Sequence, residues 1–349
     1  MGFRAGEKGR ETVADPIWIT EAEVTSLMDM GEAIAALERG LALEAEGKAE
    51  NMVKTHAIWG GGHTLHAVGA LFPESGFVGT KTWAHTEGGA TPLLILFDSH
   101  DGALKAIIEA FALGQLRTGG ISGVATRWLA APAADDMALI GTGKQAIAQL
   151  AAVAAVRSLR RLRVFSPDPG RRAAFVKRVR GELDLPAEEA ASVVAAVEGA
   201  SIITLVTRAR ASFLNSGMAA RGAHINAVGA ITPERMEFEP ELLARAAIIA
   251  ADSVPQVRNL SREFQEALGS DEAQWRRVIP ISAIVATREP RPRGTDLTLF
   301  KAMGMGISDL SLGVEIYRRA REKGLGRAIP HPQRAKPRLK AVAPALQGD

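Results

Sequence analysis

Three basic side chains lie inside otherwise apolar or glycine-rich segments, where an unpaired charge is costly. Lys54 lies in MVKTHA, Lys81 in FVGTKTW and Arg117 in QLRTGG. Burial lowers the pKa of a lysine toward neutrality, and arginine can hold a carboxylate through two parallel hydrogen bonds. Glu109, shortly before Arg117, is a candidate for orienting Lys81 or Arg117. The four residues together predict a site that binds a carboxylate and transfers a proton.

Four histidines, His56, His63, His66 and His85, fall in the same part of the chain as the two lysines. On a strand, His63 and His66 would point to opposite faces, and the spacing of the four matches no common metal site. We therefore expect no bound metal, and we interpret His85 as a substrate contact.

A glycine-rich turn indicates a coenzyme. Residues 137–146 read MALIGTGKQA, a short apolar strand that runs into the pattern G-x-G-x-x-A and an alanine-rich helix. In this fingerprint Gly141 permits the sharp turn, Gly143 lets the backbone approach a pyrophosphate, and Ala146 allows the helix to lie close to the strand. The coenzyme-binding residues that we expect are Gly141, Thr142, Gly143, Lys144, Gln145 and Ala146 in the turn, and Thr207, Val228 and Gly229 after later strands.

The end of the second strand of such a unit distinguishes NAD from NADP. Enzymes that use NAD place Asp or Glu there for the ribose hydroxyls, whereas enzymes that use NADP replace the acid and add arginine. Here Ser166 stands in the acidic position, and Arg171 and Arg172 follow. This pattern favours NADP(H), while Asp168, within reach of a ribose, leaves NAD(H) open.

The remaining chain shows two patterns. Ile17–Ile19 predicts a first strand, and short runs separated by glycine over residues 51–97 predict an antiparallel meander of about four strands. From Asp136 onward strands and helices alternate, which predicts a doubly wound parallel sheet of the Rossmann type. In this half we also predict helices over residues 187–197 and 298–317.

The predicted fold class is therefore α/β, with a Rossmann domain and a second domain of α+β type. We expect residues 15–130 and 298–325 to form the α+β domain and residues 131–297 to form the NAD(P)-binding domain. Residues 1–14 and 326–349 are expected to be flexible tails, because they are polar or basic and rich in glycine or proline.

Composition limits the function classes. The chain has 349 residues, 47% of them hydrophobic and 23% charged, as expected for two globular domains. It lacks cysteine, which excludes disulfides, a thiolate nucleophile and cysteine-bound zinc. No apolar run approaches the ~20 residues of a membrane helix, so we expect a cytoplasmic protein without membrane contact. The basic, proline-rich C-terminal stretch is typical of a solvated extension, so we expect no nucleic-acid partner.

Five segments together resemble the ornithine cyclodeaminase/mu-crystallin family, over nearly the whole chain between Ile17 and Tyr317. The segments are GTK at 79–81, LRTGGISGVAT at 116–126, LIGTGKQA at 139–146, GAHINAVGA at 222–230 and LFKAMGMGISD at 299–309. The resemblance implies a homodimer whose α+β domain makes the interface and holds the substrate carboxylate, while the Rossmann domain binds NAD(P).

By position, Lys81 resembles the catalytic lysine of this family and Arg117 its carboxylate-binding arginine. Lys54 stands where the family commonly has another arginine, so a point charge replaces a planar fork. Members that cyclise ornithine carry an aspartate just after the NAVG turn, and Ile231 occupies that place here. Ketimine reductases that resemble mu-crystallin also lack this aspartate.

The resemblance thus implies an NAD(P)H-dependent reductase of a small 2-imino acid, or in reverse an amino-acid dehydrogenase. Lys54, Lys81, Arg117 and His85 would bind the substrate, and Lys81 would donate the proton. Three alternatives remain open at this point: an ammonia lyase with bound NAD, a non-catalytic crystallin-like binding protein, and an opine-type reductase.

Overall fold

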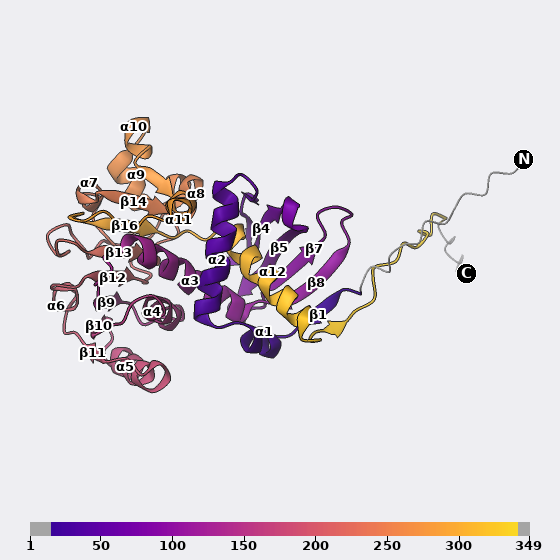
Figure 1. Ribbon diagram of the computed structural model, residues 1–349, viewed down its shortest axis with the longest axis horizontal. Helices are drawn as coiled ribbons and strands as arrows, with labels where there is room; N and C mark the ends of the chain where they lie inside the picture. Colours follow the sequence, from indigo (N-terminus) through magenta and orange to yellow (C-terminus); the bar gives the residue numbers. More distant parts are fainter. Residues whose placement is uncertain (1–14, 341–349) are drawn as a thin grey trace, which may run out of the picture.

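The chain forms an α/β fold with two β-sheets and helices packed around them (Figure 1). This computed structural model describes residues 15–340; the predicted tail over residues 1–14 and the last part of the C-terminal tail, 341–349, lie outside them. The first sheet combines strands from both ends of the chain, whereas the second is built from residues between Asp136 and Lys301.

Within residues 15–340, nine strands form the first sheet: β1 (Ile17–Ile19), β2 (Glu50–Asn51), β3 (Thr55–Trp59), β4 (His63–Phe72), β5 (Phe77–Thr86), β6 (Gly89–Ala90), β7 (Leu93–Phe97), β8 (Leu104–Glu109) and β17 (Arg327–Ala328). Eight strands form the second sheet: β9 (Asp136–Ile140), β10 (Arg161–Phe165), β11 (Ala187–Glu189), β12 (Ile202–Leu205), β13 (His224–Ala227), β14 (Ile248–Ala251), β15 (Val278–Pro280) and β16 (Thr298–Lys301). The helices are α1 (Glu21–Leu27), α2 (Met30–Ala45), η1 (Pro73–Ser75), α3 (Phe111–Leu129), α4 (Ala146–Ala154), α5 (Pro169–Leu183), α6 (Val193–Val197), α7 (Leu242–Arg245), α8 (Val254–Leu260), α9 (Arg262–Leu268), α10 (Glu272–Trp275), α11 (Ile281–Thr287) and α12 (Gly306–Glu322).

The first sheet contains the predicted meander, with β3, β4, β5, β7 and β8 paired antiparallel in succession. Its inner face carries Val68, Lys81 and Leu94 at paired positions, all of them buried. Helix α12 covers this face (Figure 1) and begins very close to β4, since a Cβ on Gly306 would lie 1.7 Å from the Gly69 carbonyl oxygen. The close approach brings the first turn of α12 over Lys81.

The second sheet is parallel throughout, in the order β11-β10-β9-β12-β13-β16-β14-β15, which confirms the predicted doubly wound sheet. The order reverses between β9 and β12, where the glycine turn follows β9. In open sheets of this kind, ligands bind outside the carboxyl ends of the strands at such a switch point.

Three predictions about elements are wrong. The predicted helix over residues 187–197 begins as strand β11 and becomes helical only at Val193, after Ser192 caps it. The predicted helix over residues 298–317 begins as β16, a fully buried strand between β13 and β14, so residues 298–301 belong to the second sheet and not to the first. The predicted tail from residue 326 starts with β17, which pairs with β1.

Helix α3 lies between the two sheets and joins them (Figure 1). A Cβ on Gly119 would lie 2.4 Å from the Ala148 carbonyl oxygen, so only glycine allows α4 to approach this closely. Near its C-terminus, Thr126 accepts a hydrogen bond of 2.9 Å from the Asn226 amide on β13. The start of α3, with Arg117, therefore has a fixed position relative to the second sheet.

Candidate active site

The centre of the site is a buried ion cluster on three separate elements. Nζ of Lys81, on β5, donates to Oδ1 of Asp309 over 2.5 Å, and their side chains are 4% and 2% exposed. Nε of Arg117, in the second turn of α3, lies 3.3 Å from the same oxygen. The structure thus brings together Lys81 and Arg117, as predicted, around an aspartate for which the sequence predicts no role.

The position of Asp309 depends on the chain that enters α12. The buried carboxylate of Asp252, after β14, accepts hydrogen bonds from the amides of Met303 (2.8 Å) and Gly304 (2.7 Å). A few residues on, the Asn51 side chain accepts from the amide of Ile307 over 2.9 Å. These contacts hold the segment between β16 and Asp309 against both sheets.

The pKa of Lys81 is suited to proton transfer. Burial, and after it the neighbouring Arg117, lower the pKa of Lys81, while Asp309 raises it; the net pKa is about 8. The pKa of Lys54 is also lowered, mainly by burial and secondly by the charge of Arg117. Lys54, in the segment between β2 and β3, is therefore close enough to Arg117 for their charges to interact.

The ion cluster around Asp309 contains more basic than acidic side chains, and two of its buried polar atoms lack a hydrogen-bond partner in the described chain. Lys54, Lys81 and Arg117 face Asp309, with Asp252 nearby. Within the described residues, Nε of Arg117 and Oδ2 of Asp309 are buried without a hydrogen-bond partner. An anionic ligand that also has a hydrogen-bond donor would satisfy both atoms and balance the charge.

An aromatic stack borders Lys81 on the inner face of the first sheet. Nζ of Lys81 lies 5.2 Å from the ring centroid of Trp83, and Trp83 stacks on His66 with centroids 4.6 Å apart. Burial lowers the pKa of His66 to about 4, so this ring is neutral at neutral pH. His85 lies four residues beyond Lys81, about 13 Å along the strand, at an exposed position. Its predicted contact with substrate stays a prediction.

The turn after β9 fits a dinucleotide. Gly141 has φ of +114°, and a Cβ there would lie 2.6 Å from the Val206 carbonyl oxygen. A Cβ on Gly143 would meet nothing within 4 Å, so the backbone at this position faces open space. Lys144 is exposed, and the Gln145 side-chain oxygen is buried without a partner in the described chain. The turn therefore offers an open backbone and a cation where a pyrophosphate is expected.

At the end of β10, Ser166 follows the last strand residue directly and is 7% exposed. The Asp168 carboxylate caps α5 by accepting from the Arg171 amide over 3.0 Å. Arg172 donates to the Ser166 carbonyl (2.9 Å) and to Glu189 (3.0 Å), which fixes its guanidinium beside this strand end. The other residues of the predicted set, Thr207, Val228 and Gly229, follow β12 and β13 at the same edge of the sheet.

The predicted role of Glu109 in orienting Lys81 or Arg117 is wrong. Its carboxylate accepts from the Trp18 indole (3.0 Å) and from the Glu21 amide at the start of α1 (2.7 Å). Both partners lie near the N-terminus of the chain, and Asp309 occupies the orienting position. The clue in the sequence was an aspartate among the glycines of MGMGISD, the only acidic residue between Asp296 and Glu315.

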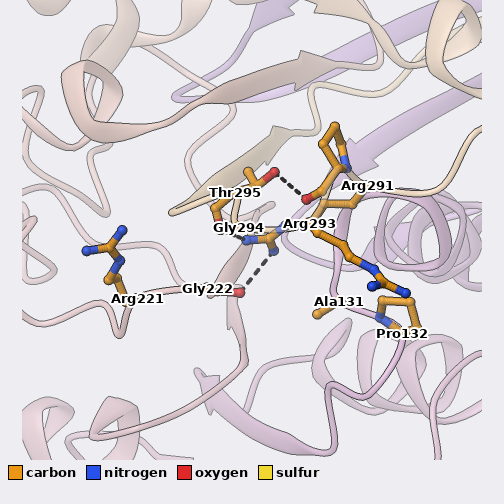
Figure 2. A pocket seen from close by; sticks show the side chains of 9 residues that line it. Ala131, Pro132, Arg221, Gly222, Arg291, Arg293, Gly294 and Thr295 are labelled. Atoms are coloured by element: carbon orange, nitrogen blue, oxygen red, sulfur yellow. Dashed lines mark hydrogen bonds between the residues drawn. The ribbon is translucent and has the colours of Figure 1, made fainter.

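A further cavity, of about 420 Å³, lies at the opposite edge of the second sheet, beside the residues that precede β9, β13 and β16. Figure 2 shows the Arg291 guanidinium directed at the Gly222 carbonyl, to which it donates over 2.9 Å, while Arg221 points away. These arginines do not converge on one point. Within residues 15–340, no group of three His, Asp or Glu side chains could hold a metal ion, and no helix is long and apolar enough to cross a bilayer.

Comparison with known proteins agrees with this geometry. The profile of the ornithine cyclodeaminase/mu-crystallin family matches residues 15–324. The chain belongs to this family. A Δ1-pyrroline-2-carboxylate reductase of Bacillus cereus is 29% identical over 266 residues, which are 74% of this chain and 78% of the relative.

Two solved structures of the same fold carry a nicotinamide coenzyme. The iminosuccinate reductase of Paracoccus denitrificans in complex with NAD+ is 25% identical, with a TM-score of 0.84 over 90% of this chain and 99% of that one. An archaeal alanine dehydrogenase dimer with bound NAD is also 25% identical, with a TM-score of 0.82 and the same coverage.

The assignment of Glu109 can be tested by Glu109→Gln. We expect turnover close to that of the wild type and a loss of stability of about 1–3 kcal/mol, because a charged acceptor of two donors is weakened. Steady-state kinetics and denaturant unfolding measure the two effects. A hundredfold loss of kcat with unchanged stability would contradict this placement and restore Glu109 to the catalytic site.

Proposed function

We propose that this protein is an NAD(P)H-dependent reductase of a small 2-imino acid, and in reverse an amino-acid dehydrogenase. The observation that carries the proposal is the buried Lys81, which has a pKa of about 8 and is paired with Asp309 beside Arg117. The activities for which the family relatives are named support it: reduction of a cyclic imine, reduction of iminosuccinate and dehydrogenation of alanine.

The proposed roles follow from charge and position. Arg117 and Lys54 bind the substrate carboxylate and so fix the orientation of the C=N bond. When bound, the reduced coenzyme supplies a hydride to the carbon of that bond. Lys81 donates its proton to the nitrogen, which leaves an amine and a neutral lysine. Asp309 holds the Lys81 ammonium in place through the hydrogen bond of 2.5 Å.

The lyase alternative finds no support at residue 231. Ile231 follows the Gly229–Ala230 turn and lies half-buried against the core of the second sheet. An isoleucine side chain can neither transfer a proton nor hold an ammonium group. A non-catalytic binding protein would have no need for a proton donor, so this alternative does not explain the buried ion pair of Lys81 and Asp309.

A second copy of the chain is the proposed partner of the outer face of the first sheet. This face, opposite Lys81, carries Leu65 and Leu71, which are 49% and 38% exposed, beside the half-buried Val78, Ile95 and Ile107. Exposed apolar side chains gathered on one face of a sheet are typical of an interface. The family relative that is described as a dimer supports a homodimer here.

We favour NADP(H) over NAD(H) as the coenzyme. Ser166 leaves the strand end without an acid, and the Asp168 carboxylate is engaged as a helix cap. The Arg171 side chain is 80% exposed, with Nε 3.5 Å from Oδ2 of Asp168 in a surface ion pair that a 2′-phosphate could replace, and Arg172 is fixed close by. The relatives with bound NAD+ or NAD keep NAD(H) as the alternative.

The proposed function is tested by oxidation of NADPH and NADH with a panel of imines: cyclic 2-imino acids, and 2-keto acids mixed with ammonia or methylamine. We expect steady oxidation with at least one imine, and a loss of at least about 100-fold in kcat for Lys81→Ala, since general acid catalysis contributes this much. Lys105→Ala is the matched control, because this lysine of the same sheet pairs with Asp98 at the surface.

Ammonia release from ornithine is measured alongside. Ammonia without net coenzyme oxidation would establish a lyase and contradict the proposal. Turnover of Lys81→Ala at the wild-type rate would remove Lys81 from the mechanism.

The pH profile gives an independent test of the proton donor. Reduction requires the protonated lysine, so kcat/KM should fall as pH rises through about 8, the pKa of Lys81. Because Asp309 raises the pKa of Lys81, Asp309→Asn should move this descending limb to lower pH. If the descending limb came from titration of the substrate imine, its pH would be the same in Asp309→Asn as in the wild type. An identical limb in both proteins would assign the limb to the substrate and contradict a Lys81 donor.

Ser166→Asp tests the coenzyme preference. The new carboxylate would repel a 2′-phosphate and accept from ribose hydroxyls, so we expect kcat/KM for NADPH to fall at least about tenfold and that for NADH to hold or rise. Arg178→Ala, whose guanidinium pairs with Glu182 further along α5, serves as the control. A wild-type protein that already prefers NADH would refute the NADP(H) assignment.

A further inference from the structure

Glu237 is a wholly buried carboxylate for which the reaction above has no use. It lies in the long connection between β13 and α7 and has no exposed surface. Oε1 accepts from the Thr207 amide (2.6 Å) and hydroxyl (2.8 Å), and Oε2 accepts from the amides of Gly229 (2.8 Å) and Ala230 (3.1 Å). One side chain thus joins the loop after β12 to the loop after β13.

These two loops meet the glycine turn at the carboxyl edge of the sheet. A Cβ on Gly141 would lie 3.2 Å from Cγ2 of Thr207, and a Cβ on Gly229 would lie 2.2 Å from the Thr207 carbonyl oxygen. The three loops are therefore in close contact on both sides of the switch point. A dinucleotide that binds across this point has its pyrophosphate at the glycine turn and its second half along the loops after β12 and β13.

Two further buried charges complete the network. Nζ of Lys301, the last residue of β16, donates to the Ala230 carbonyl over 2.7 Å and lies 3.5 Å from Glu263. Glu263 in turn accepts from the Glu237 amide (3.1 Å) and the Ser261 hydroxyl (2.7 Å). All three charged side chains are 0% exposed. Such burial is a weak source of net stability, because desolvation offsets the attraction between the charges.

We propose that Glu237 is a positioning residue for the coenzyme. Through Thr207, Gly229 and Ala230 it holds the two loops in the arrangement that receives the nicotinamide half, and Lys301 and Glu263 hold Glu237 and Ala230. The inference rests on the proposed use of a nicotinamide coenzyme, and it assigns a role in coenzyme affinity to a side chain that does not itself contact substrate.

Glu237→Gln tests the inference, because the amide has the same shape but turns a donor toward one of the two loops. We expect the Kd for NADPH and NADH, from fluorescence titration, to rise at least about tenfold, with a lowered Tm. Asp136→Asn is the matched control: this carboxylate binds Arg163 over 2.6 Å at the opposite edge of the same sheet. The control should lower Tm and leave both Kd values unchanged.

A Kd for Glu237→Gln within twofold of the wild type, with Tm lowered as in Asp136→Asn, would overturn the inference and leave the proposed function intact. Failure of the wild type to bind either coenzyme would overturn both. Where Glu237→Gln fails to fold, Glu263→Gln replaces it, since Glu263 holds the Glu237 amide. A raised coenzyme Kd in that variant supports the inference, and an unchanged Kd overturns it.

Discussion

The Asp309 carboxylate is the point on which the substrate side of the structure depends. It lies against the Lys81 ammonium and the Arg117 guanidinium, so it links β5, α3 and α12 in one buried cluster. Removing one partner of a buried ion pair typically costs about 3–5 kcal/mol, because a charge is left without compensation. Here the loss would leave the Lys81 and Arg117 cations next to each other without a counter-charge. The same carboxylate thus supports both the fold and the pKa of Lys81.

The contacts around this cluster explain how residues from both sheets can act on the C=N bond of one proposed substrate. The chain passes from β16 of the nucleotide sheet to Asp309 in only eight residues, and Asp252 holds the intervening amides. Helix α3 forms the second link, since it carries Arg117 near its start and is bonded to β13 near its end. In the proposed reaction, Lys81 would therefore keep a fixed position relative to the carboxyl edge of the second sheet.

The site residues that the sequence predicts are local in character. The glycine turn, Ser166 at the strand end, Lys81 and Arg117 are recognisable because each stands out within its own segment. Asp309, Asp252 and Glu237 were missed because their roles arise from contacts with residues far away in the chain. Glu109 was misplaced for the same reason, since its partners Trp18 and Glu21 lie some 90 positions earlier. Strand β16 was predicted as part of a helix because its four-residue stretch, TLFK, is short and lies just before the helical pattern of α12.

The most direct test of the account follows the reacting atoms themselves. Reduced coenzyme with deuterium at both C4 positions of the nicotinamide ring is supplied with a 2-imino acid, and the amino acid formed is analysed by mass spectrometry and NMR. The account predicts one deuterium at the α-carbon of the product, and loss of this labelled product in Lys81→Ala. Consumption of imine without deuterium in the product, or ammonia release from ornithine with the label retained in the coenzyme, would contradict it.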